Sequence, residues 1–124
     1  MEYMIRVSAY AEAEPYVTKD GSIIRELMHP DKHAGRVQSL AEAIVPVGAE
    51  TILHVHRRSE ELYHFTHGQG RMILGDETFD VRAGDTVCIA PGMPHRLQNT
   101  GAEPLVLLCC SSPAYSHEDT ELLA

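Results

Sequence analysis

Basic residues are scarce in this sequence of 124 residues, which has ten lysines and arginines against eighteen aspartates and glutamates and a formal net charge of −8. Arg57 and Arg58 form the only adjacent basic pair, and the remaining basic residues are scattered. Proteins that bind nucleic acid normally carry a basic stripe, which neutralises phosphates and releases their counterions. We therefore expect no nucleic-acid partner.

Cysteines and long apolar runs are also few. Cys88, Cys109 and Cys110 make a poor disulfide framework, because their number is odd and two of them are adjacent. They lie in apolar runs, so we interpret them as small core residues in a reducing compartment. The longest apolar run, 105–110, is too short to cross a bilayer, and the N-terminus has no secretory signal. These features predict a soluble, cytoplasmic protein with no membrane partner.

Helical periodicity is absent, and short β-like runs dominate instead. About nine such runs are separated by glycine, proline, asparagine and aspartate, a spacing typical of an all-β sandwich or barrel. The length fits one domain with a core that needs no disulfides. We expect an irregular or partly paired N-terminal arm over 1–20, a β domain over 21–111, and a polar surface tail over 112–124.

Four residues have the types and spacing of a metal site. His54 and His56 are one residue apart on a predicted strand, so their side chains point to the same face. Glu61 follows the turn 57–60, and a hairpin there would return it beside both histidines. His95 lies much later in the chain and could close the site. Ordinary surface or core histidines remain the alternative at this point.

Two longer motifs surround these residues, and together they resemble the two motifs of the cupin family. The spacing between them is 15 residues, as in small microbial cupins. The second motif differs from the family pattern only at Ala90, where proline is usual. The motifs read Gly48-x5-His54-x-His56-x4-Glu61-x6-Gly68 and Gly84-x5-Ala90-Pro91-Gly92-x2-His95-x3-Asn99.

The resemblance implies an all-β cupin barrel, that is, a double-stranded β-helix or jelly roll. It also implies that His54, His56, Glu61 and His95 bind one divalent transition metal per chain inside the barrel. Manganese or iron is favoured, and zinc, nickel or copper also suits a mixed nitrogen and oxygen ligand set. Glu60 competes with Glu61, because the first motif also permits the shorter spacing, but strand parity favours Glu61.

Other polar and aromatic residues invite less specific hypotheses. Arg71 begins the next predicted strand, where larger decarboxylating relatives place an arginine in the pocket; it would bind a carboxylate beside the metal, and a solvated arginine is the alternative. Tyr63 and Phe65 would either line the pocket or pack in the core, and Asn99 is expected to tie a strand end. Four further histidines lack ligand-like partners and are interpreted as surface residues, although the first two could cap the pocket: His29, His33, His64 and His67.

Two classes of function fit this site. The first is a metalloenzyme that acts on a small oxygen-rich or carboxylate molecule, by dioxygenase, isomerase or decarboxylase chemistry. The second is a non-catalytic module that binds or senses a sugar or another small ligand, but such family members often lose metal ligands and this chain retains all four. We also expect a homodimer that forms through the outer strands, with the segment 22–27 and an exchanged N-terminal arm at the interface. A monomer whose arm folds back on its own sheet is the alternative.

Overall fold

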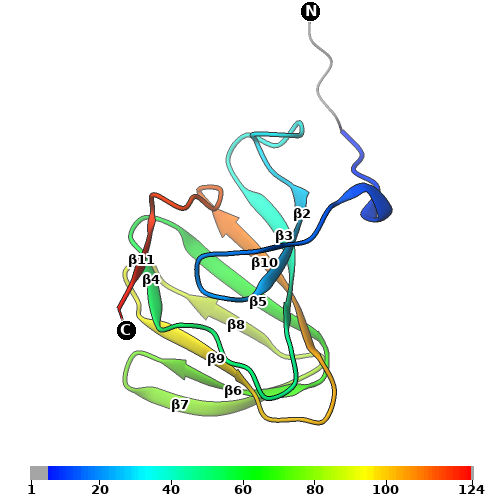
Figure 1. The fold of residues 1–124 in the computed structure, drawn as a ribbon. Coiled ribbons are helices and arrows are strands. Elements are labelled where there is room, and N and C mark those ends of the chain that lie inside the picture. Colours follow the sequence, from blue (N-terminus) through cyan, green and yellow to red (C-terminus); the bar gives the residue numbers. More distant parts are fainter. Residues whose placement is uncertain (1–5, 124) are drawn as a thin grey trace, which may run out of the picture.

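The computed structural model describes residues 6–123, which form two antiparallel sheets packed against each other (Figure 1). This arrangement confirms the predicted all-β class. The only helix among the described residues is a short 3-10 turn, and no described helix is long and apolar enough to span a membrane. The elements in chain order are η1 (Tyr10–Glu12), β1 (Tyr16–Val17), β2 (Ile23–Met28), β3 (Ser39–Val45), β4 (His54–His56), β5 (Glu60–His67), β6 (Gln69–Leu74), β7 (Glu77–Arg82), β8 (Thr86–Ile89), β9 (His95–Asn99), β10 (Leu105–Ser112) and β11 (Thr120–Leu122).

The order of strands in the sheets differs from their order in the chain. One sheet has six strands in the order β1-β2-β3-β10-β5-β8, and the other has five in the order β11-β4-β9-β6-β7. Strand β10 therefore lies between β3 and β5, and consecutive segments pass repeatedly from one sheet to the other. This crossing places β4 and β9 side by side, although about forty residues separate them.

Alternating burial along the strands places the core between the two sheets. On β5, the side chains of Glu61, Tyr63 and Phe65 are buried, whereas Glu60 and Leu62 on the opposite face are exposed. Apolar side chains from both sheets meet in one cluster, and its largest fully buried members are Phe65, Met72, Ile89, Leu97, Leu105 and Leu107. The same alternation directs Glu61 inward, so strand parity positions a carboxylate at the edge of the apolar core.

Turn residues end the strands where the sequence predicts. Gly75 and Asp76 form the two-residue loop between β6 and β7, and Gly75 has a φ of 57°. Glycine at the first position of such a loop is typical of a type II′ hairpin turn, because other residues enter positive φ only at a cost. Gly75 and Asp76 thus join two paired strands. The turn 57–60 does not form the hairpin considered from the sequence, because β4 and β5 lie in different sheets, and Glu61 instead meets the histidines across the barrel.

The C-terminal segment differs from the expected surface tail. Strand β11 pairs with β4, with Thr120 opposite His56, and both Asp119 and Thr120 are buried. The interpretation of 112–124 as a free tail is therefore wrong. The polar composition of 112–124 suggests an exposed segment, but the polar side chains of Asp119 and Thr120 are buried and hydrogen-bonded, as described below for the metal centre.

The N-terminal arm is partly paired, as expected. Tyr16 and Val17 pair with Ile24 and Ile23 of β2 in the same chain, and the Asp20–Gly21 turn joins the two strands. This turn lies over the barrel, since the Asp20 carbonyl accepts a hydrogen bond from the Ile52 N–H at 2.8 Å. The homodimer stays a prediction.

Two expectations about side-chain burial are wrong. Cys88 is exposed, because it lies on the outer face of β8, although Cys109 packs against the core as expected. His29 and His33 are buried instead of lying on the surface. The His29 N–H donates to His33 Nδ1 at 2.9 Å, and His29 Nε2 lies 2.8 Å from the Tyr115 carbonyl oxygen, so each ring has a hydrogen-bond partner.

Candidate metal centre

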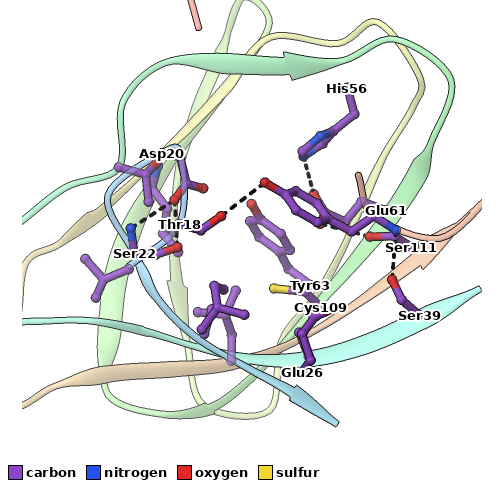
Figure 2. Close-up of a pocket in the computed structure, with 18 of the residues that line it drawn as sticks. Thr18, Asp20, Ser22, Glu26, Ser39, His56, Glu61, Tyr63, Cys109 and Ser111 are labelled. Carbon is purple, nitrogen blue, oxygen red and sulfur yellow. Dashed lines mark hydrogen bonds and ion pairs between the residues drawn. The ribbon is translucent and has the colours of Figure 1, made fainter. Parts of the chain in front are cut away.

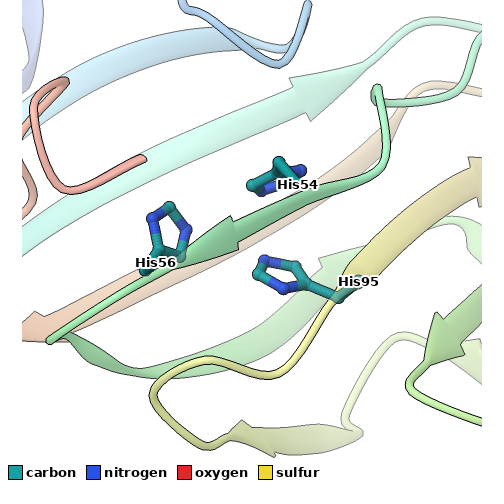
Figure 3. Close-up of side chains that lie close together, drawn as sticks. All are labelled: His54, His56 and His95. Carbon is teal, nitrogen blue, oxygen red and sulfur yellow. The ribbon is translucent and has the colours of Figure 1, made fainter. Parts of the chain in front are cut away.

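Three buried histidines from two neighbouring strands converge inside the barrel (Figure 3). His54 and His56 lie on β4, and His95 lies directly opposite His54 on β9. Their exposed fractions are only 1%, 6% and 0%. One potential ligand atom from each ring lies within 4.8 Å of the others, so the three imidazoles could hold one metal ion. The i, i+2 spacing of His54 and His56 therefore brings both rings to the same centre, as predicted from the sequence.

Glu61 brings a carboxylate to this cluster from the opposite sheet. Its Oε1 atom lies 3.1 Å from His56 Nε2 and 3.6 Å from His95 Nε2. Two ligand atoms bound to one ion at about 2.1 Å each are about 3.0–3.4 Å apart when they are adjacent in an octahedron or tetrahedron. The distances are therefore compatible with a shared ion. Glu60 is exposed on the opposite face of β5 and does not approach the cluster.

Hydrogen bonds at the far side of each ring orient the three imidazoles. The Nδ1 atoms of His54 and His95 lie 2.6 Å and 2.9 Å from the carbonyl oxygens of Ile52 and Met93, which can only accept. His56 Nδ1 lies 3.0 Å from the hydroxyl of Thr120, which donates its own hydrogen to the Ser116 carbonyl. All three Nδ1 atoms must therefore donate, and each Nε2 atom is left to face the centre. Metal-binding histidines usually have this arrangement, in which the ring nitrogen that does not bind the metal donates a hydrogen bond to an acceptor.

Several polar atoms at the centre lack partners within the described part of the chain. His54 Nε2, His95 Nε2 and Glu61 Oε1 are buried without a hydrogen bond. A buried polar atom without a partner costs about 1–3 kcal/mol, so proteins rarely leave three of them in one place. A cation bound between these atoms would satisfy all three at once. The residues present therefore fit a divalent metal ion.

The protonation of the metal-free centre follows from burial and charge. Burial lowers the pKa of His54 to about 4, and the nearby His95 contributes in the same direction. For Glu61, burial alone would raise the pKa, but contacts with His56 and His95 lower it to about 2. Burial also opposes protonation of His56, but its contact with the Glu61 carboxylate outweighs burial and raises the His56 pKa. Without metal, His56 and Glu61 thus form a buried ion pair.

A small cavity adjoins the centre, and His56 and Glu61 belong to both (Figure 2). About 40 Å³ of it is open to the centres of water molecules, which is enough for a few waters or a ligand of a few heavy atoms. Hydroxyl groups and carboxylates supply most of its polar lining, and no lysine or arginine is among the described residues that line it. Tyr63 lines this cavity, whereas Phe65 packs only in the core.

Arg71 is not brought to the centre. Its side chain lies on the outer face of β6, about half exposed, with its Nε atom 3.5 Å from Asp80 Oδ1 on β7. Met72, the next residue, is the one that points inward. The parity of β6 therefore accounts for the outward position, and the hypothesis that Arg71 enters the pocket finds no support in this geometry.

A family model for the cupin domain matches residues 41–111, which contain all four predicted ligands. The chain belongs to the cupin family. An uncharacterized protein from Methanocaldococcus jannaschii is 58% identical over 114 residues, which cover 92% of this chain and 91% of that protein. The polyketide synthase CurC from Streptomyces cyaneus is 31% identical over 121 residues, which cover 94% of this chain and 78% of CurC.

Solved structures show the same relationship. The formate complex of the oxalate decarboxylase from Lactobacillus farciminis superposes with a TM-score of 0.79 at 25% sequence identity. The match covers 91% of this cupin but 34% of the decarboxylase, so this chain spans about a third of that enzyme's length. The fold predicted from the two motifs is therefore confirmed.

The second cupin motif also contains a residue that stabilises the end of the barrel. Asn99 Nδ2 donates to the carbonyl oxygens of Val45 and Glu103, and its Oδ1 accepts from the Gly101 N–H. These bonds join β9 to β3 and close the turn before β10, so the predicted structural role of Asn99 is confirmed. Outside the motifs, His64 and His67 are exposed on β5, as expected for histidines that are not ligands.

The C-terminal segment supports the cupin centre in a way that sequence reasoning misses. The buried Asp119 carboxylate accepts hydrogen bonds from the N–H groups of Arg58 and Ser59 at 2.9 Å and 3.0 Å. This holds the turn between His56 and Glu61, while the adjacent Thr120 orients His56. A short strand carries too little periodicity to be recognised, so no signal in the sequence identifies this support.

We expect the Asp119→Asn variant to lose about 1–3 kcal/mol of unfolding free energy at pH 7, because a charged acceptor of two backbone N–H groups is replaced by a neutral amide. Although burial opposes ionisation, the hydrogen bonds from Ser59 and Arg58 hold the Asp119 pKa below its ordinary value. Its contribution is thus present above about pH 4 and is lost as the pH falls through the folded-state pKa. Urea unfolding at pH 7 and pH 3 measures both effects. The exposed Glu118→Gln variant is the control, and equal losses in the two variants would contradict this role of Asp119.

Proposed function

We propose that this cupin is a metal-dependent enzyme that binds one divalent transition metal through His54, His56, Glu61 and His95 and acts on a small oxygen-rich molecule. The observation that carries the proposal is the set of three Nε2 atoms that face one centre, with the buried Glu61 Oε1 beside them. Four protein ligands leave up to two positions of an octahedral ion for a substrate. When bound, the metal would polarise a substrate oxygen as a Lewis acid or take part in oxygen chemistry.

The ligand set limits the choice of metal. Three imidazoles and one carboxylate suit manganese, iron, cobalt, nickel, copper or zinc, and the intrinsic affinity order alone would favour copper. Calcium is disfavoured because it prefers six to eight oxygen ligands. We favour manganese or iron for the resident metal, because cells commonly supply both and because the family resemblance points to them.

The cavity limits the class of substrate. Its small volume suits a compound of a few heavy atoms. Thr18, Ser39 and Tyr115 line the cavity, and each side chain carries a hydroxyl group. Hydroxyl groups both donate and accept hydrogen bonds. With no lysine or arginine in the described lining, a doubly charged anion such as oxalate lacks a cationic partner other than the metal. We therefore favour a hydroxy or carbonyl compound over a dicarboxylate, despite the structural similarity to oxalate decarboxylase.

The direct test is substrate turnover by protein loaded separately with Mn²⁺ and Fe²⁺. A panel of small hydroxy, keto and dicarboxylic acids is incubated with and without oxygen, and products are measured by NMR. The proposal predicts turnover of a hydroxy or keto compound that depends on the metal, with little or no formate from oxalate. Reversible binding of these compounds with no turnover of any of them would instead favour the non-catalytic binding module.

Metal affinity is expected to weaken as the pH falls from 8 to 5.5. Metal binding requires a free electron pair on His56 Nε2, but the ion pair with Glu61 raises the His56 pKa in the metal-free protein. Protons therefore compete below that raised pKa, and the apparent Kd should rise up to about tenfold per pH unit. Calorimetric titration of metal-free protein with Mn²⁺ in buffers from pH 5.5 to 8 tests this. An affinity that does not change with pH would argue against histidine ligation.

A further inference from the structure

A second acidic group, outside both cupin motifs, reaches the same centre from the N-terminal arm. Asp20 lies in the turn between β1 and β2, and its carboxylate is only 13% exposed. Its Oδ2 atom is 3.3 Å from His54 Nε2, and the side chain also lines the cavity that contains His56 and Glu61 (Figure 2). Asp20 therefore lies where the predicted metal ligands meet the cavity.

Local hydrogen bonds fix the direction of this carboxylate. Asp20 Oδ1 accepts from both the backbone N–H and the hydroxyl of Ser22, at 2.9 Å and 2.7 Å. The backbone carbonyl of Asp20 accepts from the Ile52 N–H, and the Ile52 carbonyl in turn accepts from His54 Nδ1. One short chain of bonds thus orients both Asp20 and His54. Oδ1 is satisfied by Ser22, and Oδ2 is the oxygen turned toward the centre.

No hydrogen bond forms between Asp20 and His54, although their side chains are in contact. Because His54 Nδ1 donates to Ile52, the His54 Nε2 atom of a neutral ring carries an electron pair and no hydrogen. It is buried with no hydrogen-bond partner among the described residues. Two electron-rich atoms, Nε2 and Oδ2, therefore face each other across 3.3 Å. This separation equals that of adjacent ligand atoms on one ion, which is about 3.0–3.4 Å, and a cation between them turns a repulsive contact into a favourable one.

We propose that Asp20 is a metal-binding carboxylate of this centre, supplied by the N-terminal arm in addition to the three histidines and Glu61. This inference rests on the proposed metal site and goes beyond the four residues of the two motifs. The arm then does more than cover the barrel, since metal binding also anchors the turn at Asp20–Gly21.

A second carboxylate also changes the charge that a substrate meets. Glu61 and Asp20 together supply two carboxylates, whose charge would balance a divalent ion. Glu26 lines the same cavity and adds a further acidic group. Such a centre repels dianions and leaves one fewer coordination position for a bidentate ligand. It therefore selects a neutral or singly charged substrate that binds through one oxygen, such as an alcohol or a carbonyl compound.

The test compares Co²⁺ and Mn²⁺ binding by wild-type protein and by the Asp20→Asn variant. Asparagine keeps the shape of the side chain and an oxygen for Ser22 but removes the charge at the centre. We expect the affinity of Asp20→Asn for both ions to fall about 10–100-fold, as for other changes near metal ligands. The visible absorption spectrum of bound Co²⁺ should also change, because one of its ligands changes. Glu26→Gln is the matched control, since it removes a charge from the same cavity at a residue that instead lies 3.7 Å from His29 Nε2, and it should keep the wild-type spectrum.

The outcomes separate this inference from the proposed metal site. Wild-type protein that binds neither ion would refute the metal site itself. If wild type binds the ions and Asp20→Asn keeps the same affinity and Co²⁺ spectrum, Asp20 is not a ligand and the inference is wrong. If Asp20→Asn fails to fold, Asp20→Ala in its place removes the carboxylate while leaving the predicted ligands His54, His56, Glu61 and His95 unchanged. A weaker affinity with an altered spectrum supports the inference, and an unchanged affinity and spectrum contradict it.

Discussion

Replacing both His54 and His95 with alanine should abolish metal binding, reducing the bound ion from about one per chain to none detectable. These two rings lie directly opposite each other on β4 and β9, and their Nε2 atoms are buried without partners. Their loss removes two of the four predicted ligands and should weaken affinity by well over about 100-fold, which exceeds the usual effect of changes outside the ligand set. Elemental analysis after dialysis against Mn²⁺ and desalting measures the stoichiometry.

The control for this experiment is the His64→Ala/His67→Ala double variant. It removes the same number of imidazoles, but from exposed positions on β5. It should bind the same amount of metal as wild type. Equal metal content in the two double variants would mean that the ion is bound elsewhere or nonspecifically, and it would remove the basis of the proposed function. Circular dichroism should show folded protein in both cases, because none of the four histidines belongs to the apolar cluster between the sheets.

Glu61→Gln should weaken Mn²⁺ binding by at least about 100-fold, whereas Glu60→Gln should leave it unchanged. The two carboxylates are adjacent in sequence, but strand parity buries Glu61 beside His56 and His95 and leaves Glu60 exposed. Glutamine keeps the volume and one oxygen of Glu61 but removes the charge that balances the cation. Calorimetric titration of the two metal-free variants compares them directly. Loss of affinity in Glu60→Gln and wild-type affinity in Glu61→Gln would reverse the assignment.

The metal-binding residues could be identified from sequence because they obey local rules. The i, i+2 spacing of His54 and His56 on a strand fixes their common face, and the parity of β5 separates Glu61 from Glu60. His95 required more than spacing, because its approach to His54 depends on the pairing of β4 with β9. The resemblance of its motif to the second cupin motif supplied that long-range information.

The residues that sequence reasoning missed depend on tertiary contacts that leave no local pattern. Asp20 and Asp119 lie in turns that come from opposite ends of the chain, and neither has a neighbour in sequence that marks it as part of the centre. Thr120 belongs to a three-residue strand, which is too short to show alternation. Arg71 illustrates the opposite error, because a resemblance suggested a pocket role and the parity of its own strand turns it outward.

The most direct test of the central claim is anomalous X-ray diffraction from crystals of the Mn²⁺-loaded protein, with data collected on both sides of the manganese absorption edge. The account predicts one strong anomalous peak per chain, bonded to the Nε2 atoms of His54, His56 and His95 and to Glu61 Oε1. A peak only at the exposed histidines of β5, or no peak between β4 and β9 in crystals whose protein retains manganese, would contradict it.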